Sequence, residues 1–470
     1  MVVEANSGST LAAVGVAGTG SSMAVHGHQL STVVPSSVTG EEVNYELADA
    51  DLLHKLHYVR AVHVFRAPTG VAAPPLTIRE LKEPMFPWLD MYFPVSGRLR
   101  RRQAAEGEEA AAAAVGRPYV RCNDCGVRIV EVTCGATVEQ WLEAEAERGG
   151  LCKALAYDKV IGPELFFSPL LYVQVTSFKC GGMALGFTWA HLIGDIPSAV
   201  ASFRKWAQVL GGNKAPAPTL RDPLAVPPSA PPTSVTVPPS VKATAAPVGD
   251  HWVVPTTHDM VSFSFHVTEQ QLQGLQLSAT KGHHRREVVG PFELVSALMW
   301  RALAAIRGPE EEEATRMVTV VKTGPAPTSG GGPRPALTNE HRIGHVVFAT
   351  GGSSPATADV AKLAALLAGA HLEEASAVAA AAFAGADDAD VVVYGANLTF
   401  VEAEGLEVYE LELAGRRPAH VEYAVDGVGD GGAAVVHRDA GGRGRTVAAV
   451  LRRGEAGRLR AAIRDALRVA

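Results

Sequence analysis

Hydrophobic and polar positions alternate over two neighbouring stretches in the first half of the chain. Residues 171–179 (LYVQVTSFK) and 183–191 (MALGFTWAH) are joined by a Cys-Gly-Gly segment, and large apolar side chains occupy every second position of the second stretch. Successive side chains of a strand point to opposite faces, so this pattern predicts a β-hairpin with one buried face. His191 then stands at the C-terminal end of the second strand.

A helical period follows directly. In residues 196–210 (IPSAVASFRKWAQVL) apolar side chains recur three or four positions apart, with Arg204 and Lys205 on the other side. Asp195 precedes this run and Pro197 falls in its first turn, as expected for an N-cap and a first helical turn. TWAHLIGDIPSA at 188–199 is therefore predicted to be a strand-to-helix turn capped by Asp195.

Helix and strand patterns also alternate in the second half. Residues 291–308 (PFELVSALMWRALAAIRG) predict a helix that ends at Gly308, and residues 455–467 predict a closing helix. The alternation indicates an α/β protein. Strands are predicted over 260–267, 345–350, 396–400, 420–426 and 445–451.

A proline-rich stretch divides these two sets of elements. Between residues 211 and 250 repeated prolines fix φ and remove backbone donors, so neither a helix nor a central strand can persist. Residues 1 to about 40 are rich in Gly, Ser, Ala and Val and lack a sustained period, which predicts a mobile leader. The expected organisation is a disordered leader (1–40), an N-terminal domain (41–210), a crossover linker (211–258) and a C-terminal domain (259–470).

Size and charge agree with a two-domain globular protein. The 470 residues exceed one ordinary domain of about 100 to 200 residues. Hydrophobic residues make up 47% and charged residues 19% of the chain, and the net charge of -7 argues against a nucleic-acid partner. Glu4 stands where a secretory signal would carry positive charge, and no run of about 18 apolar residues predicts a membrane span.

The cysteines predict neither disulfides nor a metal centre. Five cysteines, an odd number, are spread thinly along the chain, which is typical of reduced thiols in a cytosolic protein. Cys122 and Cys125 form a C-x-x-C, but no second pair follows at zinc-finger spacing. We therefore expect no bound metal.

His191 admits several interpretations from the residues alone. It is either a catalytic base or a satisfied buried histidine. A metal site with Asp195 would have too few ligands, and a Ser-His-Asp triad lacks a G-x-S-x-G motif. Residues 427–432 (GVGDGG) fit G-x-G-x-x-G, but a strand-like AAVVHRD follows, so a hairpin loop is favoured over a dinucleotide site.

Further motifs occur in a fixed order around this histidine. HLIGD at 191–195 fits H-x-x-x-D. The others are MYFPVSGRL (91–99), VRCNDCGVRIVEVTC (120–134), PFELVSALMWRALAAIRG (291–308) and NEHRIGHVVFAT (339–350). From about Val43 to the C-terminus this ordered set resembles the plant BAHD acyl-CoA-dependent acyltransferases.

This resemblance implies a fold, a reaction and a co-substrate. The fold would be two chloramphenicol-acetyltransferase-like α/β domains with a channel between them. His191 would be the general base that takes a proton from an acceptor hydroxyl or amine as it attacks an acyl thioester, a role commonly worth about 10² to 10⁴ in rate. Asp195 would point away from the substrate and hold the local structure. Acyl-CoA would be the co-substrate, with no permanently bound cofactor; the residues that would bind it are not identified.

One position and one motif depart from the family pattern. Ile196, a β-branched residue, stands where the family usually has a glycine after the Asp. The second family motif, D-F-G-W-G, aligns with residues 412–416, where the acidic position is kept as Glu412 but the aromatic pair and both glycines are replaced. We expect that the geometry of this loop is not retained.

Two segments resemble one subgroup of the family. Residues 191–210 and 397–423 are similar to the Eceriferum and Glossy wax-biosynthesis proteins. That similarity implies a role in very-long-chain fatty acid elongation for cuticular wax, with the elongase condensing enzyme as partner and a cytoplasmic location at the endoplasmic reticulum surface through that partner.

Three hypotheses follow from these observations. The altered second motif favours an elongase accessory protein. The intact His191 and Asp195 favour a working acyltransferase that moves an acyl group, other than an aminoacyl group, to an alcohol or amine. A binding or structural module is favoured only if the channel between the domains is closed.

Overall fold

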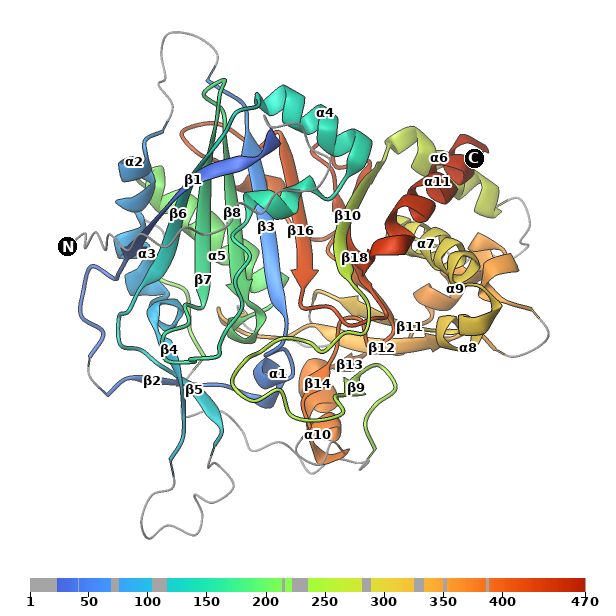
Figure 1. Ribbon diagram of the computed structural model, residues 1–470, viewed down its shortest axis with the longest axis horizontal. Coiled ribbons are helices and arrows are strands. Elements are labelled where there is room, and N and C mark those ends of the chain that lie inside the picture. Colours follow the sequence, from blue (N-terminus) through green and yellow to red (C-terminus); the bar gives the residue numbers. More distant parts are fainter. Residues whose placement is uncertain are drawn as a thin grey trace.

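The computed structural model contains two mixed β-sheets side by side, with helices on their faces (Figure 1). It describes residues 23–40, 42–68, 76–103, 116–213, 216–221, 236–280, 289–324, 334–349, 353–385 and 389–469.

The first sheet is built mainly from the N-terminal half. Its strands pair antiparallel except β6 and β7, which are parallel. In spatial order they are β1 (Val25–Val33), β6 (Val127–Cys134), β7 (Leu171–Phe178), β8 (Met183–Ala190), β3 (Tyr58–Phe65) and β16 (His420–Asp426).

Strand β16 comes from the C-terminal half of the chain. It pairs antiparallel with β3, from His420 opposite Val64 to Asp426 opposite Tyr58. Figure 1 shows it between β3 and the second sheet. Every residue of β3 is buried, so this strand needs a partner on both sides. The predicted C-terminal domain, 259–470, therefore contains one strand, at 420–426, that belongs to the first sheet.

The second sheet belongs to the C-terminal half. Strands β11, β15 and β17 are mutually parallel neighbours, and the outer pairs are antiparallel. In spatial order the strands are β10 (Met260–Val267), β18 (Arg445–Arg452), β17 (Ala433–Arg438), β15 (Leu398–Glu402), β11 (Met317–Lys322), β12 (Arg342–Val347) and β13 (Glu373–Glu374).

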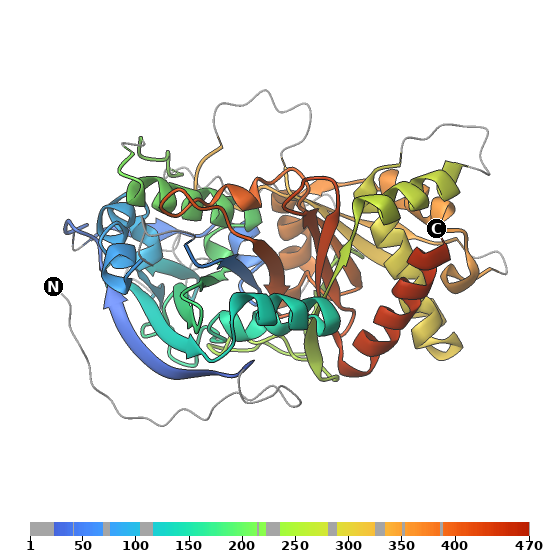
Figure 2. The same ribbon diagram turned by 90° about the horizontal axis from the view of Figure 1, so that it is seen from above.

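Helices cover both sheets. Figure 2 shows α4 and α5 on opposite faces of the first sheet, and α6, α7, α9 and α11 pack together beside the second. The helices are α1 (Asp49–Leu52), α2 (Ile78–Lys82), α3 (Met85–Met91), α4 (Val138–Arg148), α5 (Ile196–Leu210), α6 (Glu269–Thr280), α7 (Pro291–Arg307), α8 (Glu312–Thr315), α9 (Val360–Ala368), α10 (Ala375–Gly385) and α11 (Arg453–Val469).

The largest hydrophobic core is continuous between the two halves. It contains Val59 and Trp189 of the first sheet together with Val401 and Val435 of the second. A separate core lies between the second sheet and its helices, around Trp300. Since both halves share one core, they are held together by apolar packing as well as by β16.

Short strands lie in segments for which the sequence pattern predicts no strand. Within the predicted linker, β9 (Lys242–Ala243) pairs with β14 (Val391–Val392). A small sheet contains β2 (Asn44–Glu46), β5 (Pro118–Arg121) and β4 (Arg98–Arg101).

The observed N-terminal boundary differs from the predicted leader. Residues 25–33 form β1, which pairs antiparallel with the outer edge of β6. The pairing supplies backbone hydrogen bonds that the weak hydrophobic pattern of this stretch does not reveal. The rest of the predicted leader up to residue 22 lies outside the described residues.

The predicted elements around His191 are confirmed, with one correction. The hairpin is β7 and β8, and the following helix is α5. However, β8 is buried on both faces rather than one. Its small residues face the 3₁₀ helix η4 (Leu151–Leu155), whose backbone lies close to Gly186.

The second half also follows the predicted pattern, except at the glycine-rich motif. Helices α7 and α11 and the five predicted strands are present, with shifted bounds for β12 and β15. Residues 427–432, predicted to be a hairpin loop, instead connect β16 of the first sheet to β17 of the second. The prediction was wrong because sequence adjacency does not show that two neighbouring strands enter different sheets.

Substitution of Gly186 by alanine is expected to destabilise the protein by about 1–3 kcal/mol. A Cβ atom at this position would lie 1.8 Å from the Leu155 carbonyl oxygen, so strand β8 and η4 would have to separate. Gly454→Ala is the matched control, since nothing lies within 4 Å of its added Cβ. Urea unfolding of both variants measures the difference; equal midpoints would contradict the close contact.

Candidate functional site

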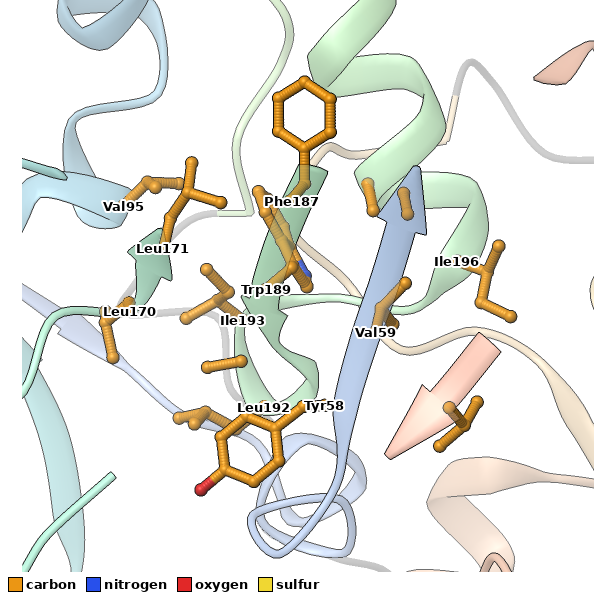
Figure 3. Packing of buried hydrophobic residues seen from close by; sticks show 14 of the residues in the cluster. Tyr58, Val59, Val95, Leu170, Leu171, Phe187, Trp189, Leu192, Ile193 and Ile196 are labelled. Carbon is orange, nitrogen blue, oxygen red and sulfur yellow. The ribbon is translucent and has the colours of Figure 1, made fainter. Parts of the chain in front are cut away.

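The H-x-x-x-D segment is the turn between β8 and α5. His191 begins the 3₁₀ helix η5 (His191–Ile193) directly after β8, and Gly194 has φ 149°. Asp195 is the N-cap of α5, with its Oδ1 accepting a hydrogen bond from Ser198 N at 3.1 Å. Trp189, Leu192 and Ile193 lie among the core side chains around this turn (Figure 3). The predicted capping role of Asp195 is confirmed.

Asp195 also binds the loop before β12. Its Oδ2 accepts hydrogen bonds from Arg334 Nη2 at 2.6 Å and from Glu340 N at 3.2 Å. Burial favours a raised pKa for Asp195, but the Arg334 guanidinium and His341 outweigh it and hold the pKa well below its usual range. Asp195 is therefore an ionised carboxylate that joins the N-terminal half to residues 334–340.

His191 is fully enclosed. Its exposed fraction is 0%. Its Nε2 shares a hydrogen bond with the Tyr394 hydroxyl at 3.0 Å, while its Nδ1 is buried without a hydrogen-bond partner among the described residues. Asn339 Nδ2 donates to the His191 carbonyl oxygen at 3.1 Å and fixes the backbone. Neither ring nitrogen is open to a substrate in this arrangement.

Burial makes His191 a poor proton acceptor. Desolvation is the main cause that lowers its pKa to about 3, with a smaller contribution from His341, while Asp195 acts in the opposite direction. A general base works best when its pKa lies near the working pH. His191 is therefore neutral at pH 7 and has little affinity for a proton.

Three further histidines surround His191, and we call the four together the histidine cluster (His54, His57, His191 and His341). The His54 and His191 rings are stacked, with centroids 4.5 Å apart. His54 Nε2 lies 3.0 Å from His341 Nε2. His57 Nδ1 donates to the Gly427 carbonyl oxygen at 2.7 Å, and its Nε2 accepts from Val393 N at 3.0 Å. The cluster therefore links both halves of the chain.

Sequence reasoning missed most of this cluster. His54 and His57 lie in DLLHKLH, just before β3, and His341 lies in the NEHRIGH segment. Tyr394, which closes the site, follows the apolar run VVV. The spacing of His54 and His57 was the available signal, but nothing in it indicates contact with residues about 140 to 340 positions away.

The second family motif lies away from the cluster. Leu413 and Arg416 exchange backbone hydrogen bonds across a tight turn in which Ala414 and Gly415 have φ of 48° and 74°. Arg416 Nη1 donates to the Arg66 carbonyl oxygen, just past the end of β3, at 3.3 Å. That end of β3 pairs with the start of β16, whereas His57 precedes the opposite end. Glu412 is exposed.

The C-x-x-C cysteines do not form a common site. Cys122 is buried and Cys125 is exposed. Neither belongs to the group of potential metal ligands found in the described part of the chain.

Comparison with known proteins identifies the relatives of this chain. Residues 23–324 match the model of the Transferase family. The chain is 36% identical to Protein ECERIFERUM 26-like of Arabidopsis thaliana, over 88% of this chain and 89% of the relative. It is 34% identical to Protein ECERIFERUM 2 of the same plant, over 87% and 90%. A hydroxycinnamoyltransferase of Narcissus pseudonarcissus is 25% identical over 63% and 64%.

Solved structures share the fold. Vinorine synthase has a TM-score of 0.63 at 17% identity, covering 92% of this chain and 96% of that protein. The TRI101 protein of F. graminearum, complexed with coenzyme A and deoxynivalenol, has a TM-score of 0.65 at 15% identity, covering 89% and 97%. The predicted pair of acyltransferase-like domains is confirmed.

Proposed function

The chain belongs to the BAHD family of transferases, and from this premise we propose that it is an accessory protein of very-long-chain fatty acid elongation in which His191 performs no acyl transfer. The identity of 34–36% to ECERIFERUM proteins, over about nine-tenths of the chain, supports the link to cuticular wax biosynthesis. The elongase condensing enzyme is the proposed partner, and the surface of the endoplasmic reticulum the proposed location. Among the described helices, none has the length and apolar character to cross a bilayer.

The burial of His191 is the main support for the proposal that this residue does not catalyse acyl transfer. A general base must come within about 3 Å of the proton that it removes, directly or through one water. The His191 side chain has 0% exposure, and Tyr394 occupies its Nε2. A substrate would have to displace the Tyr394 hydroxyl and separate rings that are packed between the two halves.

Retained acyl-CoA binding forms part of the proposal. The TRI101 structure contains coenzyme A, which supports a binding surface for this ligand in the shared fold. In an accessory protein such a surface would hold an acyl-CoA near the condensing enzyme without cleaving the thioester.

A working acyltransferase is the second candidate function. The intact pair of His191 and Asp195 favours it, because Asp195 still caps α5 and holds the turn that positions the histidine. The two candidates differ in whether purified protein releases free coenzyme A only when an alcohol or amine acceptor is added. We expect no acceptor-dependent release.

The substitution His191→Ala is expected to leave elongation intact. The variant, expressed with an elongase condensing enzyme, should extend acyl chains to the same lengths and within about twofold of the same amount as the unmodified protein. Loss of the ring stacked on His54 should lower the free energy of unfolding by about 1–3 kcal/mol, so expression level is measured alongside the acyl chains.

The control separates chemistry from folding. His345→Ala changes an exposed histidine on β12, outside the cluster, and should match the unmodified protein in both measurements. A His191→Ala variant that unfolds cooperatively but no longer supports elongation would favour the transferase instead.

A further inference from the structure

A cavity lies at the opposite end of β16 from the histidine cluster. It has a volume of about 510 Å³ and lies between α4 of the N-terminal half and β10 and α11 of the C-terminal half. Helices α4 and α11 each contact β10. His420, the first residue of β16, lines the cavity, whereas the last residues of β16 lead to Gly427 and His57. At 3.3 Å per residue the two sites are about 20 Å apart.

Three side chains with metal-binding atoms converge beneath this cavity. The Cys152 sulfur, an imidazole nitrogen of His420 and a carboxylate oxygen of Glu422 all lie within 4.8 Å of one another. The Cys152 Sγ to His420 Nε2 distance is 3.7 Å. His420 and Glu422 are two apart on β16, so both point to the same face. Cys152 belongs to η4, which precedes the hairpin.

One carboxylate oxygen of this group is buried without a partner. Glu422 is 5% exposed, and its Oε2 has no hydrogen-bond partner among the described residues. The nearby Glu145 carboxylate already accepts hydrogen bonds from Gly150 N at 2.8 Å and Leu151 N at 2.7 Å. Arg60 is engaged by Asp426 and Asp158. A buried carboxylate oxygen without a partner is costly, so a cation or a proton is needed here.

We propose that Cys152, His420 and Glu422 bind a zinc ion, with its fourth coordination position facing the cavity. Thiolate, imidazole and carboxylate are the ligands that Zn²⁺ takes, and three protein ligands with one open position are typical of zinc sites that accept a further ligand. Metal–ligand bonds of about 2.0–2.3 Å place tetrahedral ligand atoms about 3–4 Å apart, close to the observed spacing. On binding, the Cys152 thiol and the Glu422 carboxyl group both release their protons to solvent.

The site joins parts of the chain that are far apart in sequence. Cys152 comes from the N-terminal half, and the other two ligands come from the strand that the C-terminal half contributes to the first sheet. His420 is partly exposed to the cavity, which supplies an entry path for the ion. Zinc would therefore link β16 to η4 at the end of the strand that lies farther from His57.

Metal analysis of the purified full-length chain tests the proposal. After incubation with Zn²⁺ and dialysis, the unmodified protein should retain about one zinc per chain. His420→Ala and Cys152→Ser should each lower the zinc affinity by more than about 100-fold, because loss of a group that only hydrogen-bonds a ligand already costs about 10- to 100-fold. With Co²⁺ in place of zinc, a thiolate-to-cobalt charge-transfer band should appear and be absent from Cys152→Ser.

Two controls make the result specific. Cys125→Ser removes an exposed thiol, and His266→Ala removes a histidine that lines the same cavity outside the ligand group; both should keep the metal. Each variant's cooperative thermal unfolding is recorded, and zinc should raise the midpoint of the unmodified protein but not of His420→Ala. Less than about one-tenth of a zinc per unmodified chain, with no rise in its midpoint, would overturn the proposal. Equal retention by His420→Ala would also overturn it.

Discussion

Acidification from pH 6.5 to pH 5.5 is expected to remove about 5 kcal/mol of stability from this protein. Burial is the main cause of a lowered pKa at five fully enclosed histidines, which are His54 (well below its usual value), His57 (about 4), His63 (about 3), His191 (about 3) and His437 (about 4). Each stays neutral in the folded chain but takes up a proton in the unfolded chain near pH 6.5.

The sign follows from proton uptake. Below pH 6.5 these histidines bind more protons in the unfolded state than in the folded state, so the stability that they contribute falls as pH falls. Each such histidine contributes about 1 kcal/mol between pH 6.5 and 5.5, because its unfolded form is only half protonated at pH 6.5. At lower pH it contributes about 1.4 kcal/mol per pH unit until the pH nears a folded pKa of about 3 to 4. Total stabilities of about 5–15 kcal/mol make this loss large enough to unfold the protein near pH 5.

Urea unfolding at pH 8.0, 7.0, 6.5 and 5.5 measures this dependence. The contribution of the histidines to the free energy of unfolding should change little between pH 8.0 and 7.0 and fall steeply below 6.5. His63→Gln provides the control, since removal of one buried histidine should reduce the loss between pH 6.5 and 5.5 by about 1 kcal/mol. A flat profile between pH 6.5 and 5.5 would contradict the buried neutral state of these histidines.

Local patterns predicted the turn that carries His191 because its determinants lie within about 20 residues. The alternation of large and small side chains predicted β8, and the 3.6-residue period of apolar side chains predicted α5. The short polar side chain of Asp195 predicted the N-cap. These features depend on residues that are neighbours in the chain, so the order of residues is enough to predict them. The chemical state of His191 depends on other contacts.

Contacts between distant segments decide that state, and the sequence did not reveal them. Tyr394 meets His191 across 203 residues, and Asn339 fixes its carbonyl across 148. The sequence predicts β16 as a strand of the C-terminal half, yet this strand pairs with β3 in the first sheet. Strand β3 is buried along its whole length, so its backbone needs a partner strand on this side. Pattern reasoning therefore predicted the histidine's position but not its enclosure.

Asp195→Ala is expected to destabilise the protein by about 3–5 kcal/mol, the largest effect of any single change in the H-x-x-x-D motif. The substitution removes the helix cap of α5 and leaves Arg334 and the backbone N–H of Glu340 without their shared acceptor. Asp195→Asn is the matched control. It keeps an oxygen for Ser198 N and should cost about 1–2 kcal/mol less.

Urea unfolding at pH 7.5 and the elongation measurement together separate the two motif residues. Asp195→Ala should lose elongation in proportion to the loss of folded protein, whereas His191→Ala should retain it. An Asp195→Ala variant as stable as the unmodified chain would show that the contacts to Arg334 and Glu340 contribute little. The expected difference would show that the Asp195 carboxylate stabilises the junction between α5 and the C-terminal half. This role does not depend on contact between the His191 imidazole and a substrate.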